Sequence, residues 1–289
     1  MFGRQRSWTL LLPLLPLAMA AIKCSSGHSG GPEGTSLAQK EAPLIDDDSV
    51  LSRPASPPDA QIAYGSGSDE IADLRFGGER AAQRPLVVLV HGGFWRPAYD
   101  RTHTGPMAQA LAAAGWTVVS PEYRRIPGNP DATLRDVRSA LEVLPAKVDG
   151  RRHNGHVVVI GHSAGGHLAL WAAAAGLKAP LQGVLALAPV ADLRLAEELR
   201  LGGGAVGAFL GVRAESRAEL DPRRMSSPSV STTIVQGEED AVVPPAIAES
   251  FVAAHPKVRL VRIQAAGHYA LIDPLSAAWP VVLEELGRL

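Results

Sequence analysis

The sequence predicts an α/β domain built on a doubly wound, mostly parallel sheet with helices on both faces. Short runs rich in Val, Ile and Leu recur along the chain, and such continuous apolarity is typical of strands buried on both faces of a parallel sheet. Segments of helical periodicity separate these runs, and alternating strands and helices are the pattern of this architecture. Ligands bind such sheets beyond the carboxyl ends of the strands, so functional residues are expected there.

Eight strands are expected. Residues 62–65 and 70–76 alternate apolar and polar side chains around a turn-like SGSD, which predicts an antiparallel hairpin. The buried strands are expected within residues 85–92, 116–123, 156–163, 181–189, 231–237 and 257–264. Helices are expected over 130–144, where Asn129 would cap the helix and Pro130 would start it, and over 244–255 and 274–289.

The composition excludes several classes of function. The chain has 289 residues, of which 46% are hydrophobic and 20% charged, with a net charge of −1. Nucleic acids and anionic membranes need a clustered basic excess, so neither is an expected partner. The single cysteine, Cys24, excludes an intrachain disulfide and any cysteine-based metal site.

The first 60 residues differ in composition from the rest. Residues 1–24 carry two arginines, an apolar run and an Ala18-Met19-Ala20 cleavage site, which predicts a signal peptide and hence export to the cell envelope or medium. A lipoprotein signal at Cys24, or a cytoplasmic protein, is the alternative. Residues 25–60 are rich in Ser, Gly and Pro and predict a disordered linker. The catalytic domain is therefore expected over 61–289, without a membrane span.

One serine lies where a strand is expected to turn into a helix. Gly161-His162-Ser163-Ala164-Gly165 fits the pattern G-x-S-x-G, between a Val-rich run and an Ala-rich segment. On a sharp strand-to-helix turn the serine adopts a strained conformation, and its neighbours must be small to avoid clashes. Ser163 is therefore the predicted nucleophile.

A serine hydroxyl needs a base to remove its proton, and the chain has nine histidines. His162 and His167 are too close to Ser163 in sequence for their side chains to turn back onto it. His268 follows the last expected strand directly, which places it at the carboxyl edge and after the serine in chain order. His268 is therefore the predicted base.

The base in turn needs an acid to hold its tautomer. Asp240 lies just beyond an expected strand, between Ser163 and His268 in chain order. Its neighbours Glu238 and Glu239 are rivals, and so is Asp192 after the preceding strand. Asp240 is preferred because a helix is expected to begin just after it.

The remaining element is a set of donors for a developing oxyanion. The segment His91-Gly92-Gly93-Phe94-Trp95 ends an expected strand, and glycines there let backbone N–H groups turn toward the site. The N–H of Ala164, just after the nucleophile, is the second expected donor.

Taken together, HGGFW, GHSAGGH, QGEEDAVVP and GHYALIDP resemble the α/β-hydrolase superfamily. The branch they resemble contains kynurenine formamidases, BD-FAE-like feruloyl or acetyl-xylan esterases and relatives of the prolyl-oligopeptidase catalytic domain. The resemblance covers about residues 61–289. It implies Ser163, Asp240 and His268 as the catalytic triad and the backbone of Gly93, Phe94 and Ala164 as the oxyanion hole.

The same resemblance implies a reaction that uses no cofactor and no metal. It also implies a small helical cap in the insertion 191–228, which with Phe94 and Trp95 would shape a substrate-binding pocket. The expected activity is hydrolysis of a carboxylic ester or small amide through an acyl-enzyme. An arylformamidase, a small aminopeptidase and a non-catalytic binding protein of the same fold remain alternatives.

Overall fold

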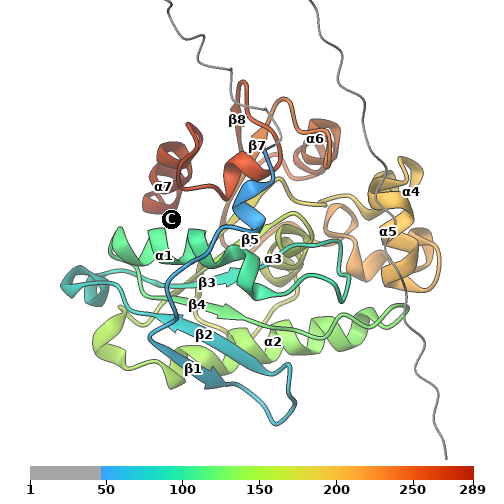
Figure 1. The fold of residues 1–289 in the computed structure, drawn as a ribbon. Helices are drawn as coiled ribbons and strands as arrows, with labels where there is room; N and C mark the ends of the chain where they lie inside the picture. The colour runs from blue at the N-terminus through green and yellow to red at the C-terminus, as the bar shows by residue number, and fades with distance from the viewer. Residues whose placement is uncertain (1–46) are drawn as a thin grey trace, which may run out of the picture. The chain divides into compact units, whose positions relative to one another are not determined.

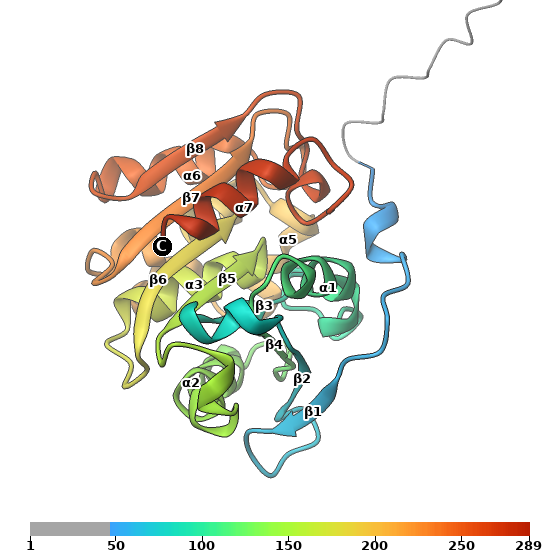
Figure 2. The same cartoon turned by 90° about the vertical axis from the view of Figure 1, so that its left-hand side faces the viewer.

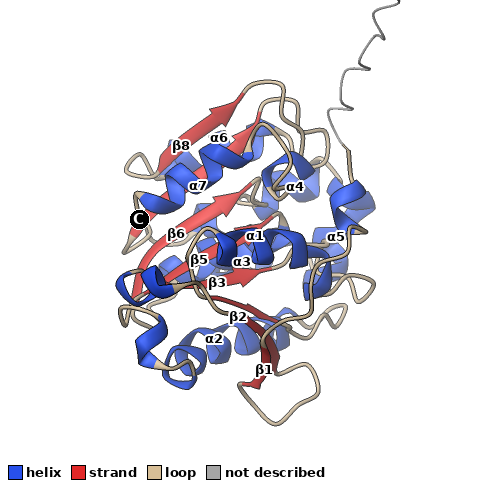
Figure 3. Ribbon diagram, turned by 60° about the vertical axis from the view of Figure 1, so that its left-hand side comes forward, coloured by secondary structure: helices blue, strands red, loops and turns tan. Residues whose placement is uncertain are grey.

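The computed structural model describes residues 47–289, which form one mixed sheet of eight strands with helices on both faces (Figures 1 and 3). The spatial order of the strands is β1-β2-β4-β3-β5-β6-β7-β8. In chain order they are β1 Ala60–Ala63, β2 Ile71–Arg75, β3 Leu86–Val90, β4 Val118–Pro121, β5 Val157–His162, β6 Leu181–Leu187, β7 Ser231–Gly237 and β8 Arg259–Ile263. The predicted fold class is confirmed.

The first two strands form the expected hairpin. Ala63 pairs with Ile71 at its closed end, and β2 continues antiparallel against β4. All later pairs are parallel, from β4 through β3 and β5 to β8. The carboxyl ends of β3, β5, β6, β7 and β8 therefore meet at one edge of the sheet.

Seven helices cover the sheet and its carboxyl edge. They are α1 Gly105–Ala113, α2 Pro130–Lys147, α3 Ala164–Ala174, α4 Leu193–Glu198, α5 Leu201–Leu210, α6 Pro245–Ala254 and α7 Trp279–Gly287. Short 3-10 turns are η1 Ser49–Leu51, η2 Glu79–Gln83, η3 Arg101–Thr104, η4 Gly150–Arg152, η5 Ala214–Ser216, η6 Ala218–Leu220, η7 Pro222–Arg224 and η8 Tyr269–Leu271. Helix α1 was not expected from the sequence.

The alternation of side chains along each strand divides the core into two layers. Val88 and Val159 belong to the layer under α2, α3 and α6, whereas Val87 and Val158 belong to the layer under α1 and α7. Because successive side chains of a strand point to opposite faces, a continuous apolar run fills both layers at once. Figure 2 shows α1 and α7 together on one side of the sheet.

Local signals in the sequence account for several helix ends. The side chain of Asn129 accepts a hydrogen bond from the N–H of Ala132 at 3.3 Å, and Pro130 opens α2 as expected. In α5 the residues Gly202, Gly203 and Gly204 all have positive φ, so its first turn is not regular helix. Glycine tolerates this conformation without a side-chain clash.

The predicted linker is wrong at its carboxyl end. Residues 47–59 pack on the domain: Val50 is only 1% exposed, in the layer with α1 and α7, and Arg53 pairs with Asp273. The apolar side chains in this segment are too few to show helical or strand periodicity, so composition alone did not reveal the packing. The predicted signal peptide and the rest of the linker lie outside the described residues.

The insertion between β6 and β7 contains helices α4 and α5 and the turns η5 to η7. Asp221 lies fully buried at its base, where the carboxylate accepts a hydrogen bond from the N–H of Leu193 at 3.1 Å. Burial raises the pKa of Asp221 to about 6, and hydrogen bonds from the backbone of Leu193, Arg194 and Arg223 only partly offset this effect. A charged carboxylate at neutral pH is therefore a cost to the folded state.

We expect Asp221→Asn to stabilise the domain above pH 6. The folded chain binds the proton of Asp221 more tightly than the unfolded chain, so stability falls as the pH rises from 3.8 to about 6 and stays reduced above it. Asparagine keeps the acceptor for Leu193 but carries no charge. The difference in unfolding free energy between the variant and the wild type should grow by about 2 kcal/mol from pH 4 to pH 8.

Urea denaturation between pH 4 and pH 8 measures this effect. The difference between the variant and the wild type should shrink toward pH 4. Glu79→Gln, at an exposed carboxylate, is the control and should show no such trend. A difference that is constant across the whole pH range would contradict the assignment to Asp221.

Candidate active site

Ser163 lies in the turn that joins β5 to α3. Its φ of 56° and ψ of −118° lie in a region that residues with a side chain rarely adopt. Its backbone is fixed on both sides, because its N–H donates to the carbonyl of Leu187 at 2.9 Å and its carbonyl accepts from the N–H of Val190 at 3.2 Å. The strand-to-helix turn expected from the sequence is therefore present.

The glycines around Ser163 allow this turn to pack. A Cβ on Gly161 would lie 2.1 Å from the carbonyl oxygen of Gly165, and one on Gly165 would lie 2.1 Å from the carbonyl oxygen of Val90. A Cβ on Gly166 would lie 2.8 Å from the Cβ of Pro189. The helix thus contacts two neighbouring strand ends at distances that no larger residue permits.

The structure brings Asp240 and His268 together at the carboxyl edge. The Nδ1–H of His268 donates to Asp240 Oδ2 at 2.7 Å, and both residues are nearly fully buried, at 2% and 4% exposure. The other oxygen of Asp240 accepts from the N–H groups of Val242 and Val243 at 2.9 and 2.7 Å. A carboxylate held this way fixes the ring so that Nε2 is the basic nitrogen of neutral His268.

The rival acids lie elsewhere. Glu238 and Glu239 are exposed beyond the end of β7. Asp192 caps helix α4 through the N–H of Leu195 at 2.9 Å and accepts a hydrogen bond from Ser250. Of these acids, the structure places only Asp240 against His268.

The two histidines near Ser163 have structural contacts that the sequence did not indicate. His162 donates from Nε2 to the carbonyl of His268 at 3.1 Å, and their rings lie 4.4 Å apart. His167 donates from Nε2 to the carbonyl of Leu220 at 2.8 Å, which ties α3 to the cap insertion. Burial lowers the pKa of His162 well below 6.5 and that of His167 to about 4, so both rings are neutral.

The loop after β3 approaches Ser163 closely. A Cβ on Gly92 would lie 2.8 Å from the carbonyl oxygen of His162 and 3.1 Å from the Cβ of Ser163. Gly93 and Phe94 follow with φ of 102° and 52°, and both line the same pocket as Ser163. Ala164 begins α3, and the first N–H groups of a helix have no partner within the helix. Two of the three expected oxyanion donors, Gly93 and Phe94, therefore line the pocket of Ser163, and the third, Ala164, directly follows Ser163 in the chain.

A buried charged network holds this loop from behind. His91 hydrogen-bonds Glu122 through Nε2 at 3.0 Å and stacks on Tyr123, whose hydroxyl donates to the His91 carbonyl at 2.7 Å. Burial alone would raise the pKa of Glu122, but the bonds from His91 and the Tyr123 N–H and the charge of Arg125 lower it to about 2. Glu122 is thus ionised at any pH at which the domain would work.

Trp95 does not lie in the pocket, contrary to the prediction that it binds substrate. Its side chain is 3% exposed and stacks on Phe209 of α5 at 4.5 Å, with its edge against His167. Trp95 belongs to the core layer under α3, and the neighbouring Phe94 lines the pocket instead. Trp95 therefore connects the loop after β3 to the cap insertion.

The pocket at Ser163 is small. It offers about 40 Å³ of space for water-sized groups. Besides the residues already described, its walls contain four side chains that the sequence analysis missed, from separate parts of the chain: Leu51, Tyr99, Val242 and Tyr269. The side chain of His103 also lines it, and burial lowers its pKa to about 4. Tyr269 and Val242 are sequence neighbours of His268 and Asp240, but nothing in the sequence indicated Leu51.

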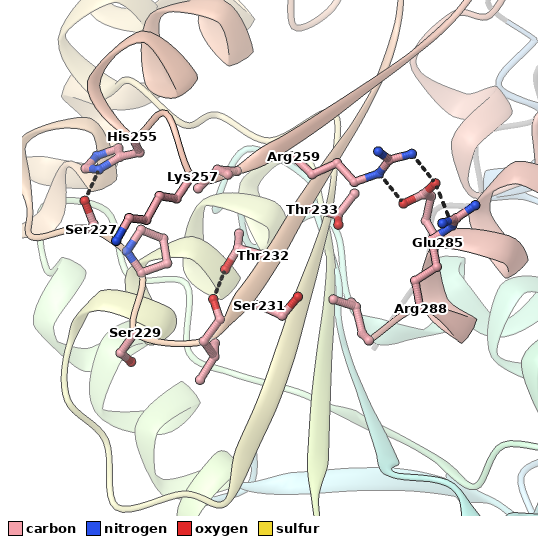
Figure 4. A pocket seen from close by; sticks show the side chains of 14 residues that line it. Ser227, Ser229, Ser231, Thr232, Thr233, His255, Lys257, Arg259, Glu285 and Arg288 are labelled. Carbon is pink, nitrogen blue, oxygen red and sulfur yellow. Dashed lines mark hydrogen bonds and ion pairs between the residues drawn. The ribbon is translucent and has the colours of Figure 1, made fainter.

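A larger cavity of about 590 Å³ lies at the amino ends of β7 and β8 (Figure 4). Glu285 pairs there with both Arg259 and Arg288, and Ser227 hydrogen-bonds His255 at 3.2 Å. None of the predicted site residues lines it. Because α/β sheets bind ligands at the carboxyl ends of their strands, the smaller pocket at Ser163 is the candidate active site.

Residues 47–289 contain no group of three or more His, Cys, Asp or Glu side chains arranged to hold a metal ion. Within the same range, no helix has the length and apolarity needed to cross a membrane.

A family model described as serine hydrolase matches residues 139–288, which is more than half of the chain and includes Ser163, Asp240 and His268. The chain belongs to the serine hydrolase family. A second model, described as BD-FAE, matches residues 73–188 and so covers the loop after β3. This serine hydrolase has the α/β-hydrolase fold that its motifs resemble.

Known relatives agree with this family. Kynurenine formamidase of Salmo salar is 32% identical over 109 residues, which are 37% of this chain and 36% of that protein. The chain thus spans about a third of the length of this curated relative. Among solved structures, esterase B of Lactobacillus rhamnosis has a TM-score of 0.68 at 18% identity, covering 83% of this chain and 88% of that one.

A thermophilic esterase of Thermogutta terrifontis has a TM-score of 0.63 at 19% identity, covering 82% of this chain and 95% of that one. At these identities the two solved structures share the fold of this serine hydrolase.

We expect Gly165→Ala to destabilise the domain strongly. The added Cβ would meet the backbone oxygens of Val90 and His91 at 2.1 and 2.5 Å, and backbone cannot move aside as a flexible side chain can. Overpacking of this kind costs about 1–3 kcal/mol or more. Gly287→Ala, where a Cβ meets nothing within 4 Å, is the control and should not destabilise. Thermal unfolding measures both, and equal melting temperatures would contradict the packing argument.

Proposed function

We propose that this protein hydrolyses a carboxylic ester or small amide through an acyl-enzyme formed on Ser163. The observation that supports this most is the buried hydrogen bond from His268 to Asp240, at 2.7 Å, beside the strained turn that carries Ser163. A nucleophile, a base and an orienting acid at one pocket are the signature of nucleophilic catalysis.

In the proposed reaction, Nε2 of His268 takes the proton of Ser163 as Oγ attacks the substrate carbonyl. The carbonyl oxygen becomes an oxyanion, which the N–H groups of Gly93, Phe94 and Ala164 stabilise. Collapse of this intermediate breaks the bond to the leaving alcohol or amine, which receives the proton from His268. Water then attacks the acyl-enzyme by the same steps and restores the free serine.

Asp240 stays ionised throughout and stabilises the imidazolium that forms on His268. The two N–H groups of Val242 and Val243 and the amide of Gln236 satisfy its remaining lone pairs. The neutral rings of His162 and His103 add no positive charge that would oppose protonation of His268.

The pocket favours a small acyl group. The space beside Ser163 is only about 40 Å³, which suits a short acyl group such as formyl or acetyl. An arylformamidase is therefore the second candidate, which the similarity to kynurenine formamidase of Salmo salar also favours.

We expect p-nitrophenyl acetate to be hydrolysed by the wild type, and Ser163→Ala to lower kcat by about 10⁴–10⁶-fold because the nucleophile is lost. Asp240→Asn should lower kcat by about 10⁴-fold while the fold is kept, because His268 loses its orienting acceptor. Glu239→Gln is the matched control at the adjacent exposed carboxylate and should retain activity. N-formylkynurenine is assayed in parallel and decides between ester and formamide.

A wild type that turns over neither substrate and does not react with a fluorophosphonate probe would overturn the proposed activity. That result would favour a non-catalytic binding protein of the same fold. Full turnover by Ser163→Ala would overturn the nucleophile alone. Turnover of an aminoacyl p-nitroanilide in preference to the ester would favour the small aminopeptidase.

We also propose that the chain is exported, on the basis of its first 24 residues. The two arginines, the apolar run and Ala18-Met19-Ala20 have the layout that a signal peptidase recognises. Amino-terminal sequencing of the protein from a bacterial host should give a mature chain that begins just after Ala20. An intact Met1 in the cytoplasmic fraction would contradict export, and a lipid-modified Cys24 would support the lipoprotein alternative.

A further inference from the structure

We infer that the segment just before the first strand, residues 47–59, sets the limit on substrate size at Ser163. We call this segment the N-terminal strap. Its Leu51 forms one wall of the pocket. An ion pair between Arg53 and Asp273, which we call the latch, binds the strap to the loop that carries His268. This inference rests on the proposed function, because it assigns the specificity of the same site.

Leu51 reaches the pocket from a part of the chain far from the other walls in sequence. It lines the same 40 Å³ space as Ser163 and His268 and is itself half-buried. The preceding Val50 is 1% exposed and packs in the core layer of α1 and α7. Burial of Val50 therefore holds the turn η1, and with it Leu51, at the pocket.

The latch joins the strap to the loop of the predicted base. Arg53 donates to both carboxylate oxygens of Asp273 from Nη1 and Nη2, and the Nη2–Oδ2 distance is 2.9 Å. Asp273 follows His268, Tyr269 and the turn η8 on one short loop. A bidentate ion pair fixes the relative orientation of the two side chains as well as their distance. The position of Leu51 is thereby tied to that of His268.

The carboxyl half of the strap is anchored as well. The N–H of Ser56 donates to the side chain of Gln109 on α1 at 2.7 Å, and Arg75 of β2 donates to Ser56 and to the carbonyl of Pro57. The strap contains Pro54, Pro57 and Pro58, and proline restricts the backbone to an extended path. Figure 2 shows this path past α1 to β1.

These anchors indicate a wall of fixed position. Two other walls, Phe94 and Tyr99, come from the loop after β3, which carries two of the expected oxyanion donors. With Leu51 in place the pocket has only about 40 Å³ of space. A shorter side chain at position 51 would extend the space, and a larger one would fill it. Acyl-chain preference should therefore follow the size of residue 51.

The test measures kcat/KM of the full chain for p-nitrophenyl acetate, butyrate and hexanoate. The wild type should prefer acetate. Leu51→Ala should raise the hexanoate-to-acetate ratio about tenfold or more, since one methylene in an apolar pocket changes selectivity about 10–200-fold. Leu51→Phe should lower the butyrate-to-acetate ratio by a similar factor. Loss of folding would lower every rate together and could not produce opposite shifts in these ratios.

The latch is tested in the same assay. Arg53→Ala should raise the hexanoate-to-acetate ratio about threefold or more, as Leu51→Ala does, because the wall is no longer held. The hexanoate-to-acetate ratio of Arg53→Lys should lie between those of the wild type and Arg53→Ala, because lysine cannot form the bidentate pair.

Two controls match these changes. Arg259→Ala removes a two-pronged pair with Glu285, at 2.9 and 3.0 Å, far from the pocket. Leu199→Ala shortens an exposed leucine on the cap insertion. Both should keep the wild-type ratios.

Each outcome decides a different point. If the wild type is active and its chain-length ratios stay within twofold in the Leu51 and Arg53 variants, the inference is wrong and the proposed function stands. If only the Leu51 variants shift the ratios, Leu51 limits the acyl chain as inferred, but the ion pair between Arg53 and Asp273 does not hold it in position. If the wild type is inert to all three esters, to N-formylkynurenine and to a fluorophosphonate probe, the proposed function fails and the inference fails with it.

Discussion

The candidate active site of this protein depends on the close packing of strand and helix around Ser163. The contacts at Gly161 and Gly165 leave no room for a Cβ, so β5, the end of β3 and the start of α3 meet at backbone distance. This contact imposes the strained φ of 56° on Ser163. The core layers on both sides of the sheet provide the stability that holds a conformation so unfavourable by itself.

The electrostatics of the site follow from burial. Around Ser163 the chain gathers four histidine rings, of which His103 and His162 are held neutral by burial and His91 is bonded to Glu122. His268 differs from them because a buried carboxylate accepts its Nδ1–H. The proposed reaction uses this imidazole as the base, while the other three rings make hydrogen-bonding and packing contacts.

Several distant segments complete the pocket. The loop after β3 supplies Phe94 and Tyr99, the loop after β8 supplies Tyr269, and the segment before β1 supplies Leu51. The cap insertion contacts the residues next to the pocket, through the stacking of Phe209 on Trp95 and the hydrogen bond from His167 to Leu220. The pocket is thus assembled from segments that lie far apart in the sequence.

The sequence by itself determined the sheet, the hairpin, the Asn129 cap and the turn at Ser163. These features depend on local sterics and on the period at which side chains are buried, and a short segment of sequence is enough to reveal both. It also placed Asp240 and His268 at the carboxyl edge, because parallel strands bring their ends together.

Only the tertiary structure decided which side chains share the pocket. It turned Trp95 into the core and Phe94 toward Ser163, gave His162 a contact with the His268 carbonyl, and packed Val50 and Leu51 onto the domain. These contacts join segments that are distant in the sequence, and they depend on how the packed elements fit together. A local pattern does not contain that information.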